Sequence, residues 1–306
     1  YRAERLDADG DRSMSTELAE LKSAGPQPVD ARSVGRFGLN LRAISVVWRR
    51  DLIRFSRDRV RIVTSLLQPA LFLFVLGGGL GALASDGTEG VDLQTFMFPG
   101  AIGMAVVFSA VFAASSIVAD REFGFLREML VAPVSRTAIV LGKCFGGATI
   151  ATVQGLLVLA LAGLVGVPYS PMLLLILLAE CALLAFTVTA FGVMVAARIE
   201  QFQSFLAVAQ AVIFPMFFLS GALYPLRGLP GWLQVVTHLN PLTYAIDPMR
   251  RAVFEHIDAG PAAREALNSG AHWFGWRVPT VVELLIVAVF AAVMTTVAVR
   301  NFRRIE

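Results

Sequence analysis

Residues 172–197 read MLLLILLAECALLAFTVTAFGVMVAA, and Glu180 is the only charged residue among them. A helix that crosses a hydrocarbon core of about 30 Å needs about 20 mostly apolar residues, because each residue adds about 1.5 Å. A run of this length is too long for a β-strand and too uniformly apolar for the surface helix of a soluble domain. The segment therefore predicts a transmembrane helix.

Five further segments have the same character, and they lie at about 60–83, 95–119, 137–165, 205–224 and 281–299. The 306 residues are 56% hydrophobic and 16% charged, whereas a soluble domain is about 45–50% apolar and about 25% charged. This composition excludes a mostly disordered chain, and two cysteines exclude a disulfide scaffold. We expect an all-α integral membrane protein with six transmembrane helices.

The basic residues indicate how the helices are oriented. The loop between the first two spans carries acidic residues and no basic ones, while arginines gather before the first span and after the second, fourth and sixth. Cytoplasmic loops are the ones enriched in Lys and Arg. The pattern predicts that both termini lie in the cytoplasm, as six crossings require.

The chain before the first span has two parts. Residues 1–40 are polar and of mixed charge, which predicts a flexible cytoplasmic tail ahead of a transmembrane domain at 41–306. Apolar residues then recur at spacings of three and four, namely Leu41, Ile44, Trp48, Leu52 and Phe55. They predict an interfacial amphipathic helix on the inner membrane surface, or alternatively a helix packed on another protein domain.

The segment at 226–254 is apolar but contains Pro230, Pro241 and Pro248, which interrupt any continuous span. We predict a broken re-entrant hairpin that enters the outer leaflet before the last helix without crossing it. A segment that lies on the surface is the alternative.

Signals for chemistry within the chain are missing from the sequence. His238, His256 and His272 are isolated, and no Cys or His spacing typical of a metal site occurs. Gly142-Lys143-Cys144 lacks the upstream glycine and the hydroxyl of a phosphate loop. We expect no catalytic residues, no metal and no cofactor bound by this chain. The net charge of +3 gives no reason to expect nucleic acid as a partner.

The loop after the second span, at 120–136, reads DREFGFLREMLVAPVSR. It combines charges with an apolar stripe at Phe123, Leu126 and Leu130, and Pro133 would end a short helix. The pattern predicts a small amphipathic helix at the cytoplasmic surface. An ordinary membrane-surface loop that obeys the charge rule is the alternative.

This loop resembles the signature loop of bacterial type-2 ABC transporter permeases, particularly the daunorubicin-resistance type of exporter membrane subunit. The matching residues are Arg121, Glu122, Gly124, Leu126, Leu130, Ala132, Pro133, Ser135, Arg136, Gly142 and Lys143, while Phe125 and Arg127 depart from the usual form. The stretches FLSGALYP at 218–225 and NPLTYA at 240–245 are similar to a second family segment.

The resemblance implies a membrane-spanning subunit of an ATP-driven exporter that moves a hydrophobic or amphiphilic substrate, a drug or a lipid, out of a bacterial cell through its inner (plasma) membrane. Two permease subunits, identical or sister chains, would join two ABC ATPase subunits that bind the ATP and Mg. The permease would have no ATPase site of its own. The loop would be the coupling helix, with Arg121, Glu122, Gly124, Arg127 and Glu128 contacting the ATPase.

Two other functions are also compatible with the sequence. The chain could export a polysaccharide or lipid-linked glycan, or it could be an ion-coupled secondary transporter, for which only Glu180 is a suitable intramembrane acid. Candidates for the translocation path are Glu180, Gln210, Phe214 and Phe217. The acid and the amide could equally hydrogen-bond between helices, and the phenylalanines could equally serve packing.

Overall fold

The computed structural model describes residues 36–79, 81, 93–125, 134–226, 229–257, 270–273 and 276–303. The chain divides into two units, residues 1–39 and 40–306, and the helices that could cross a membrane lie in the second. The predicted flexible tail at 1–40 lies outside the described residues except for 36–40, which are helical.

Five helices among the described residues are long and apolar enough to cross a membrane. They are Arg59–Gly77, made of α3 (Arg59–Leu71) and the wider-wound η1 (Phe72–Gly77); Leu93–Glu122, made of α5 (Leu93–Ala114) and α6 (Ser116–Glu122); α8 (Arg136–Leu159); α9 (Pro171–Ala196); and α14 (Thr280–Arg303). The fold is therefore that of a helical membrane protein.

The segment predicted as a span at 205–224 forms α10 (Phe202–Phe218), an apolar helix of 17 residues. It is shorter than the other five because the chain leaves the helix after Phe218 and turns at Gly221, where φ is +75°. Six crossings, with α10 as one of them, stay a prediction.

Helices α5, α8 and α9 pack closely on one another, and α14 packs against α9. Small residues set the distance between them. A Cβ on Gly155 of α8 would lie 2.7 Å from Val106 of α5, and a Cβ on Gly192 of α9 would lie 2.6 Å from Ala114. Such close backbone approach is how helices gain contact in a membrane, where the hydrophobic effect gives them no advantage over lipid.

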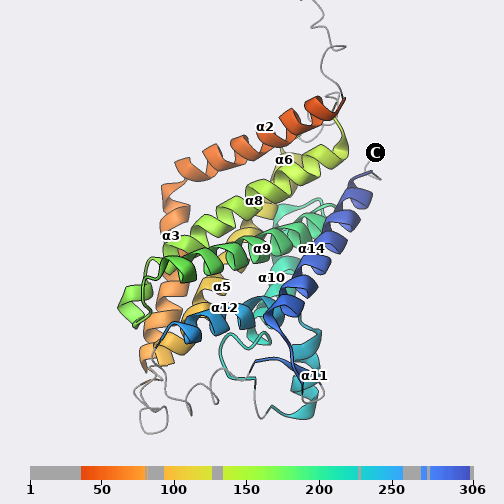
Figure 1. The fold of residues 1–306 in the computed structure, drawn as a ribbon. Helices are drawn as coiled ribbons and strands as arrows, with labels where there is room; N and C mark the ends of the chain where they lie inside the picture. Colours follow the sequence, from red (N-terminus) through yellow and green to blue (C-terminus); the bar gives the residue numbers. More distant parts are fainter. Residues whose placement is uncertain are drawn as a thin grey trace, which may run out of the picture. The chain divides into compact units, whose positions relative to one another are not determined.

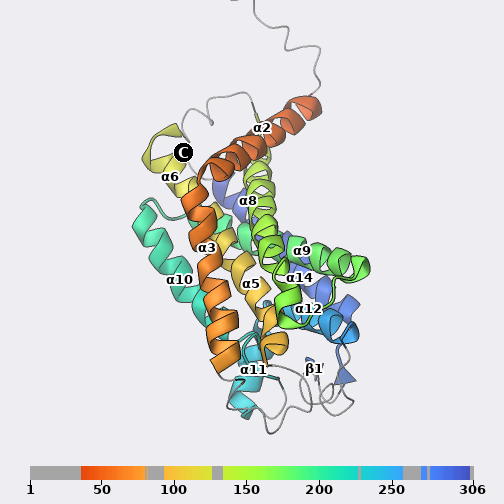
Figure 2. The same ribbon diagram turned by 90° about the vertical axis from the view of Figure 1, so that its left-hand side faces the viewer.

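Helix α2 (Arg36–Arg57) precedes α3. Asp58 lies between them and caps the start of α3, since its carboxylate accepts a hydrogen bond from the Arg61 amide at 3.0 Å. In Figures 1 and 2, α2 and the C-terminal end of α14 lie at the same end of the second unit. The face of α2 that packs on the unit contains Val47 and Asp51, which are buried. Leu41 of the predicted apolar stripe is exposed instead, and Trp48 is partly exposed while its indole N–H donates to the Thr149 hydroxyl of α8 at 3.0 Å.

At the opposite end lie α11 (Gly231–Leu239) and α12 (Thr243–Glu255) (Figure 1). A two-stranded antiparallel ribbon, β1 (His272–Trp273) with β2 (Trp276–Arg277), leads into α14. The segment at 226–254 is broken at Pro230 and Pro241 as expected, but Pro248 lies within α12. Helix α12 is buried almost throughout and packs against α5, α9 and α14, and its depth in a membrane stays a prediction.

Candidate coupling site

The loop at 120–136 joins α6 to α8 at the end of the unit where α2 lies (Figures 1 and 2). Its described parts are the α6 end with residues 123–125, and residues 134–136 at the start of α8. Ser135 begins α8, since its hydroxyl accepts a hydrogen bond from the Ala138 amide at 3.2 Å, as an N-cap residue does. Arg127 and Glu128 lie outside the described residues.

Arg121 and Glu122 bind within the chain. The Arg121 guanidinium donates to the carbonyl oxygens of Ile199, at 2.8 Å, and Ala197, at 3.2 Å, where α9 ends. The Glu122 carboxylate accepts a hydrogen bond at 2.8 Å from the amide of Phe202, the first residue of α10. A cation at a helix C-terminus and an anion at a helix N-terminus both complement the helix dipole. These two residues therefore fasten the base of the loop to the link between α9 and α10.

The part of the loop that directly follows α6 presents aromatic rings. Phe123 is 73% exposed and Phe125 is 49% exposed. Between them Gly124 has a φ of +80°, a left-handed conformation that a residue with a Cβ adopts only at a cost. Sequence reasoning placed Phe123 on an apolar stripe and chose the neighbouring charges as contact residues. The signal for the rings was two phenylalanines on either side of a glycine in a short charged loop.

The base of the loop contains a buried cluster of charged side chains from α2, α6 and α8. The Lys143 ammonium donates to Asp120 at 2.8 Å, to Ser116 at 3.0 Å and to Asp51 at 3.3 Å. A lysine ammonium has three hydrogens to donate, so these three acceptors use all of them. Lys143, Asp51 and Asp120 are buried, so the contacts form away from water.

Arg50 completes this cluster at its solvent-facing side. Its guanidinium lies 2.6 Å from the Asp120 carboxylate and 3.3 Å from that of Asp51. Burial lowers the pKa of Arg50, but the two carboxylates outweigh that effect and raise its pKa above the ordinary value. Two cations and two anions thus form a neutral group, which we call the inner ring: Arg50, Asp51, Asp120 and Lys143.

The inner ring depends on the close approach of α2 to α8. A Cβ on Gly142 would lie 2.9 Å from the Cβ of Val47, and a Cβ on Gly146 would lie 3.3 Å from the Asp51 side chain. The two glycines are four residues apart, so they lie on one face of α8. They provide the shallow surface on which α2 sits with Asp51 beside Lys143.

Comparison with known protein families identifies the chain. Residues 42–254 match the family model described as ABC-2 type transporter. The chain belongs to the ABC-2 type transporter family. Members of this family are membrane subunits of ABC transporters and work with ABC ATPase partners. The resemblance inferred from the loop at 120–136 is thereby confirmed at the level of the family.

Several curated proteins are similar to this ABC-2 permease over most of their length. The chain is 29% identical over 241 residues to the putative transport permease ycf38 of Cyanophora paradoxa, covering 78% of this chain and 82% of that protein. It is 30% identical over 216 residues to nodulation protein J of Rhizobium leguminosarum bv. viciae, covering 70% and 82%. It is 29% identical over 210 residues to the inner membrane transport permease YadH of Escherichia coli K12, covering 68% and 81%.

Three of the residues predicted to line a translocation path in the permease lie on α10, and the fourth, Glu180, lies on α9. Glu180 is buried on α9, and Phe217 is buried on α10, where its ring meets those of Phe72 and Phe108. Gln210 and Phe214 are exposed on α10, and one turn further on Phe218 is exposed as well. Only the exposed α10 residues therefore face the surroundings of the unit.

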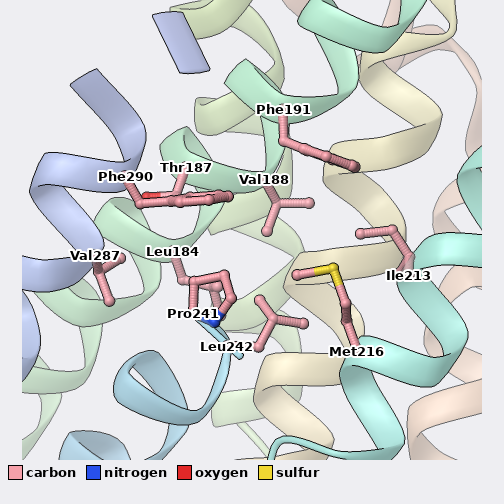
Figure 3. A pocket seen from close by; sticks show the side chains of 10 residues that line it. All are labelled: Leu184, Thr187, Val188, Phe191, Ile213, Met216, Pro241, Leu242, Val287 and Phe290. Atoms are coloured by element: carbon pink, nitrogen blue, oxygen red, sulfur yellow. The ribbon is translucent and has the colours of Figure 1, made fainter. Parts of the chain in front are cut away.

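An apolar crevice lies between α9, α10 and α14 of the permease (Figure 3). Side chains from the three helices converge there with the residues that precede α12; they are Leu184, Thr187, Val188, Phe191, Ile213, Met216, Pro241, Leu242, Val287 and Phe290. The Thr187 hydroxyl donates to the carbonyl of Leu183 at 2.7 Å. Its polar group is therefore satisfied within α9, and the crevice offers an apolar lining.

A second buried group of charges lies at the other end of the permease. Arg251 of α12 contacts Asp247 at 3.1 Å and Glu283 of α14 at 3.4 Å, and it donates to Thr280 at 2.9 Å. Arg250 donates to the carbonyl of Gly221, and its guanidinium lies 4.3 Å from the centre of the Phe96 ring. We call Asp247, Arg250, Arg251 and Glu283 the outer group. Among the described residues, no set of three His, Cys, Asp or Glu side chains could hold a metal ion.

Proposed function

We propose that this chain is the membrane-spanning subunit of an ATP-driven exporter, coupled to a separate ATPase through the loop at 120–136. The observation that carries the proposal is the loop's anchorage. Side chains at its base bind three parts of the permease: α2, α8, and the link between α9 and α10. A push on the loop would therefore reach the helices directly.

The contact with the ATPase would combine the exposed rings with the charges on the loop. Phe123 and Phe125 are exposed at the base of the loop, and Arg127 and Glu128 follow in sequence. Aromatic anchors that fill pockets contribute most to many interfaces. Arg121 and Glu122 support the loop from behind, and Gly124 provides its turn; their direct contact with the ATPase stays a prediction.

The orientation follows from the charge pattern. With α10 as the sixth crossing, α2, the loop and the end of α14 would lie in the cytoplasm of a bacterial cell. Helices α11 and α12 would lie at the outer face as the re-entrant hairpin, and the residues before α2 would be a cytoplasmic tail. The ATP and Mg would be bound by the ATPase subunits.

A second permease subunit, a copy of this chain or a sister chain, would cover the face of α3 and α10. Gln68 of α3 and Gln210 of α10 are exposed, and each has apolar residues on both sides in the sequence. Lipid tails offer no hydrogen bonds to an amide, so such groups in a membrane face protein or a water-filled path. The path for a hydrophobic or amphiphilic substrate, a drug or a lipid, would run along this face, past Phe214.

Purification of the tagged permease from its native membrane tests the proposal. We expect an ABC ATPase subunit to copurify, and ATP to drive outward movement of a fluorescent phospholipid or a fluorescent lipophilic cation in reconstituted vesicles. The double variant F123A/F125A should lose the ATPase. Trp232→Ala removes an aromatic side chain that is 70% exposed on α11 and should retain it. Transport that survives ATP depletion but collapses with the proton gradient would refute the proposal in favour of a secondary transporter.

A further inference from the structure

The inner ring connects the two ends of the loop at 120–136. Asp120 is the first residue of the loop at 120–136 and Lys143 lies after the loop, and their charged groups are 2.8 Å apart. Lys143 also bonds Ser116, one turn before Asp120 on α6. The helices before and after the loop, α6 and α8, are thus joined through their side chains. A force on the loop acts on both of them together.

The ring also joins α2 to this base. Arg50 and Asp51 are neighbours on α2, and each contacts charged groups on another element: Arg50 binds Asp120, and Asp51 binds Lys143 at 3.2 Å. Each cation therefore contacts both anions. Only one register of α2 against α6 and α8 satisfies all four groups, because a slide of one residue would turn Asp51 away from Lys143.

Stability alone is a weak explanation for such a ring. The cost of taking charges out of water can exceed what their pairing returns, and apolar residues of similar size often replace a buried ion pair without loss. A neutral buried ring does, however, specify one arrangement among several that apolar packing would allow. Here that arrangement fixes the elements on either side of the coupling loop and the helix beside them.

We propose that Lys143 and the inner ring are positioning groups that make α2, α6 and the start of α8 move as one body with the loop. This proposal rests on the proposed function of the loop. It adds which helices would move together when the ATPase pushes on the loop. Arg121 and Glu122 extend the same body to the link between α9 and α10. The ring touches neither substrate nor nucleotide; it keeps loop movement from being absorbed by slippage between helices.

The decisive variant removes one cation and one anion together. K143M/D51N leaves Arg50 and Asp120 as a neutral pair that still joins α2 to α6, while α8 is released from the ring. We expect the ATPase to copurify as before, and transport per ATP hydrolysed to fall by about tenfold, within the usual range of coupling between two sites. Lys143→Arg, which keeps a cation at this position, should retain most of the transport per ATP hydrolysed. Arg49→Gln, a change at an exposed α2 position, should match the wild type.

Rigidity is measured independently of transport. Spin labels at V46C on α2 and V153C on α8, the helix that K143M/D51N releases, both occupy exposed positions. The distance distribution between them should be narrow in the otherwise unchanged permease and should broaden with K143M/D51N. An unchanged distribution, or transport per ATP within about twofold of the wild type, would overturn the proposal. A wild-type permease that binds no ATPase would refute the proposed function instead, and the spin-label distances would still decide whether the ring fixes the helices.

Discussion

The inner ring and the outer group both contain two acids and two bases, yet they satisfy their charges differently. In the inner ring the partners are side chains on three separate elements, and all four groups have charged partners. In the outer group the arginines also bind backbone carbonyls, those of Gly221 and Val278. Several outer atoms have no hydrogen-bond partner among the described residues, including Asp247 Oδ1, Arg250 Nε and Glu283 Oε1.

This difference indicates two uses of buried charge in one membrane protein. The outer group supports segments that leave their helices, since a carbonyl in a turn needs a donor where neither water nor a helix provides one. The inner ring links helices whose backbone hydrogen bonds are already formed. It therefore fixes the register between these helices and contributes little to backbone hydrogen bonding. Substituting an outer arginine should therefore lower the free energy of unfolding. Removing one cation and one anion of the inner ring together should instead impair the joint movement of the helices.

The largest effect is expected from Arg250→Met. The side chain is buried, it supports the carbonyl of Gly221, and it lies over the Phe96 ring. The guanidinium remains charged at neutral pH, as arginine does in proteins. Removing it takes the donor from the Gly221 carbonyl and leaves the two acids of the outer group with Arg251 as their contacting cation, at a cost of about 3–5 kcal/mol in the free energy of unfolding. Thermal unfolding in detergent measures this.

Arg250→Lys provides the control for that prediction. Lysine keeps the charge but loses the planar fork that can donate to a carbonyl while lying over a ring. It should recover only part of the stability. If Arg250→Met were as stable as the wild type, the outer group would not be a support for the turn, and the comparison with the inner ring would fail.

The next largest effect is expected from Lys143→Met alone. The substitution leaves Asp51 and Asp120 buried with the half-exposed Arg50 and, beside Asp120, the exposed Arg54 as their cations. Breaking a buried ion pair in this way costs about 3 kcal/mol. The double variant K143M/D51N restores the balance and should lose less stability than the single one. Non-additivity of this sign in a double-mutant cycle, measured by unfolding in detergent, is the signature of direct coupling. Additive losses would contradict a shared ring.

The helical membrane fold was predictable because each long apolar run meets the thickness of the bilayer by itself. The runs at 95–119 and 172–197 became Leu93–Glu122 and Pro171–Ala196 with shifts of a few residues at the ends. The packed face of α2 was not predictable in this way. Asp51 lies on that face, against the apolar pattern, because its partner Lys143 comes 92 residues later in the chain.

The candidate site was predictable in its place but not in its contacts. The loop at 120–136 stood out by its charges and its resemblance to a family. Arg121 and Glu122 look like outward contacts in the sequence, but the ends of α9 and α10 that they bind lie about 80 residues away. Contacts between segments so distant in sequence depend on helix packing, which local patterns do not encode.

A smaller effect is expected from Gly142→Ala. The new methyl group would meet the Cβ of Val47 at 2.9 Å, so α2 would have to shift away from α8. Overpacking of this kind costs about 1–3 kcal/mol. Gly79→Ala is the matched control, because nothing lies within 4 Å of its position, two residues after the helix Arg59–Gly77 ends, and alanine there should change the free energy of unfolding by less than about 0.5 kcal/mol. Unfolding of both variants decides whether close approach holds α2; equal effects would show that it does not.

The smallest effect is expected from Arg54→Gln, at the edge of the inner ring. Arg54 lies 3.6 Å from Asp120 and its side chain is 57% exposed, whereas Arg50 lies 2.6 Å from the same carboxylate. An exposed ion pair contributes less than about 1 kcal/mol and is screened by salt. Arg54→Gln should therefore shift unfolding only slightly, and the shift should vanish at high salt. Arg50→Gln should cost more and keep its effect in salt, because Asp120 is buried. If Arg54→Gln and Arg50→Gln lost the same free energy of unfolding with the same sensitivity to salt, Asp120 would respond to the general positive charge of α2. Arg50 would then have no specific role in the inner ring.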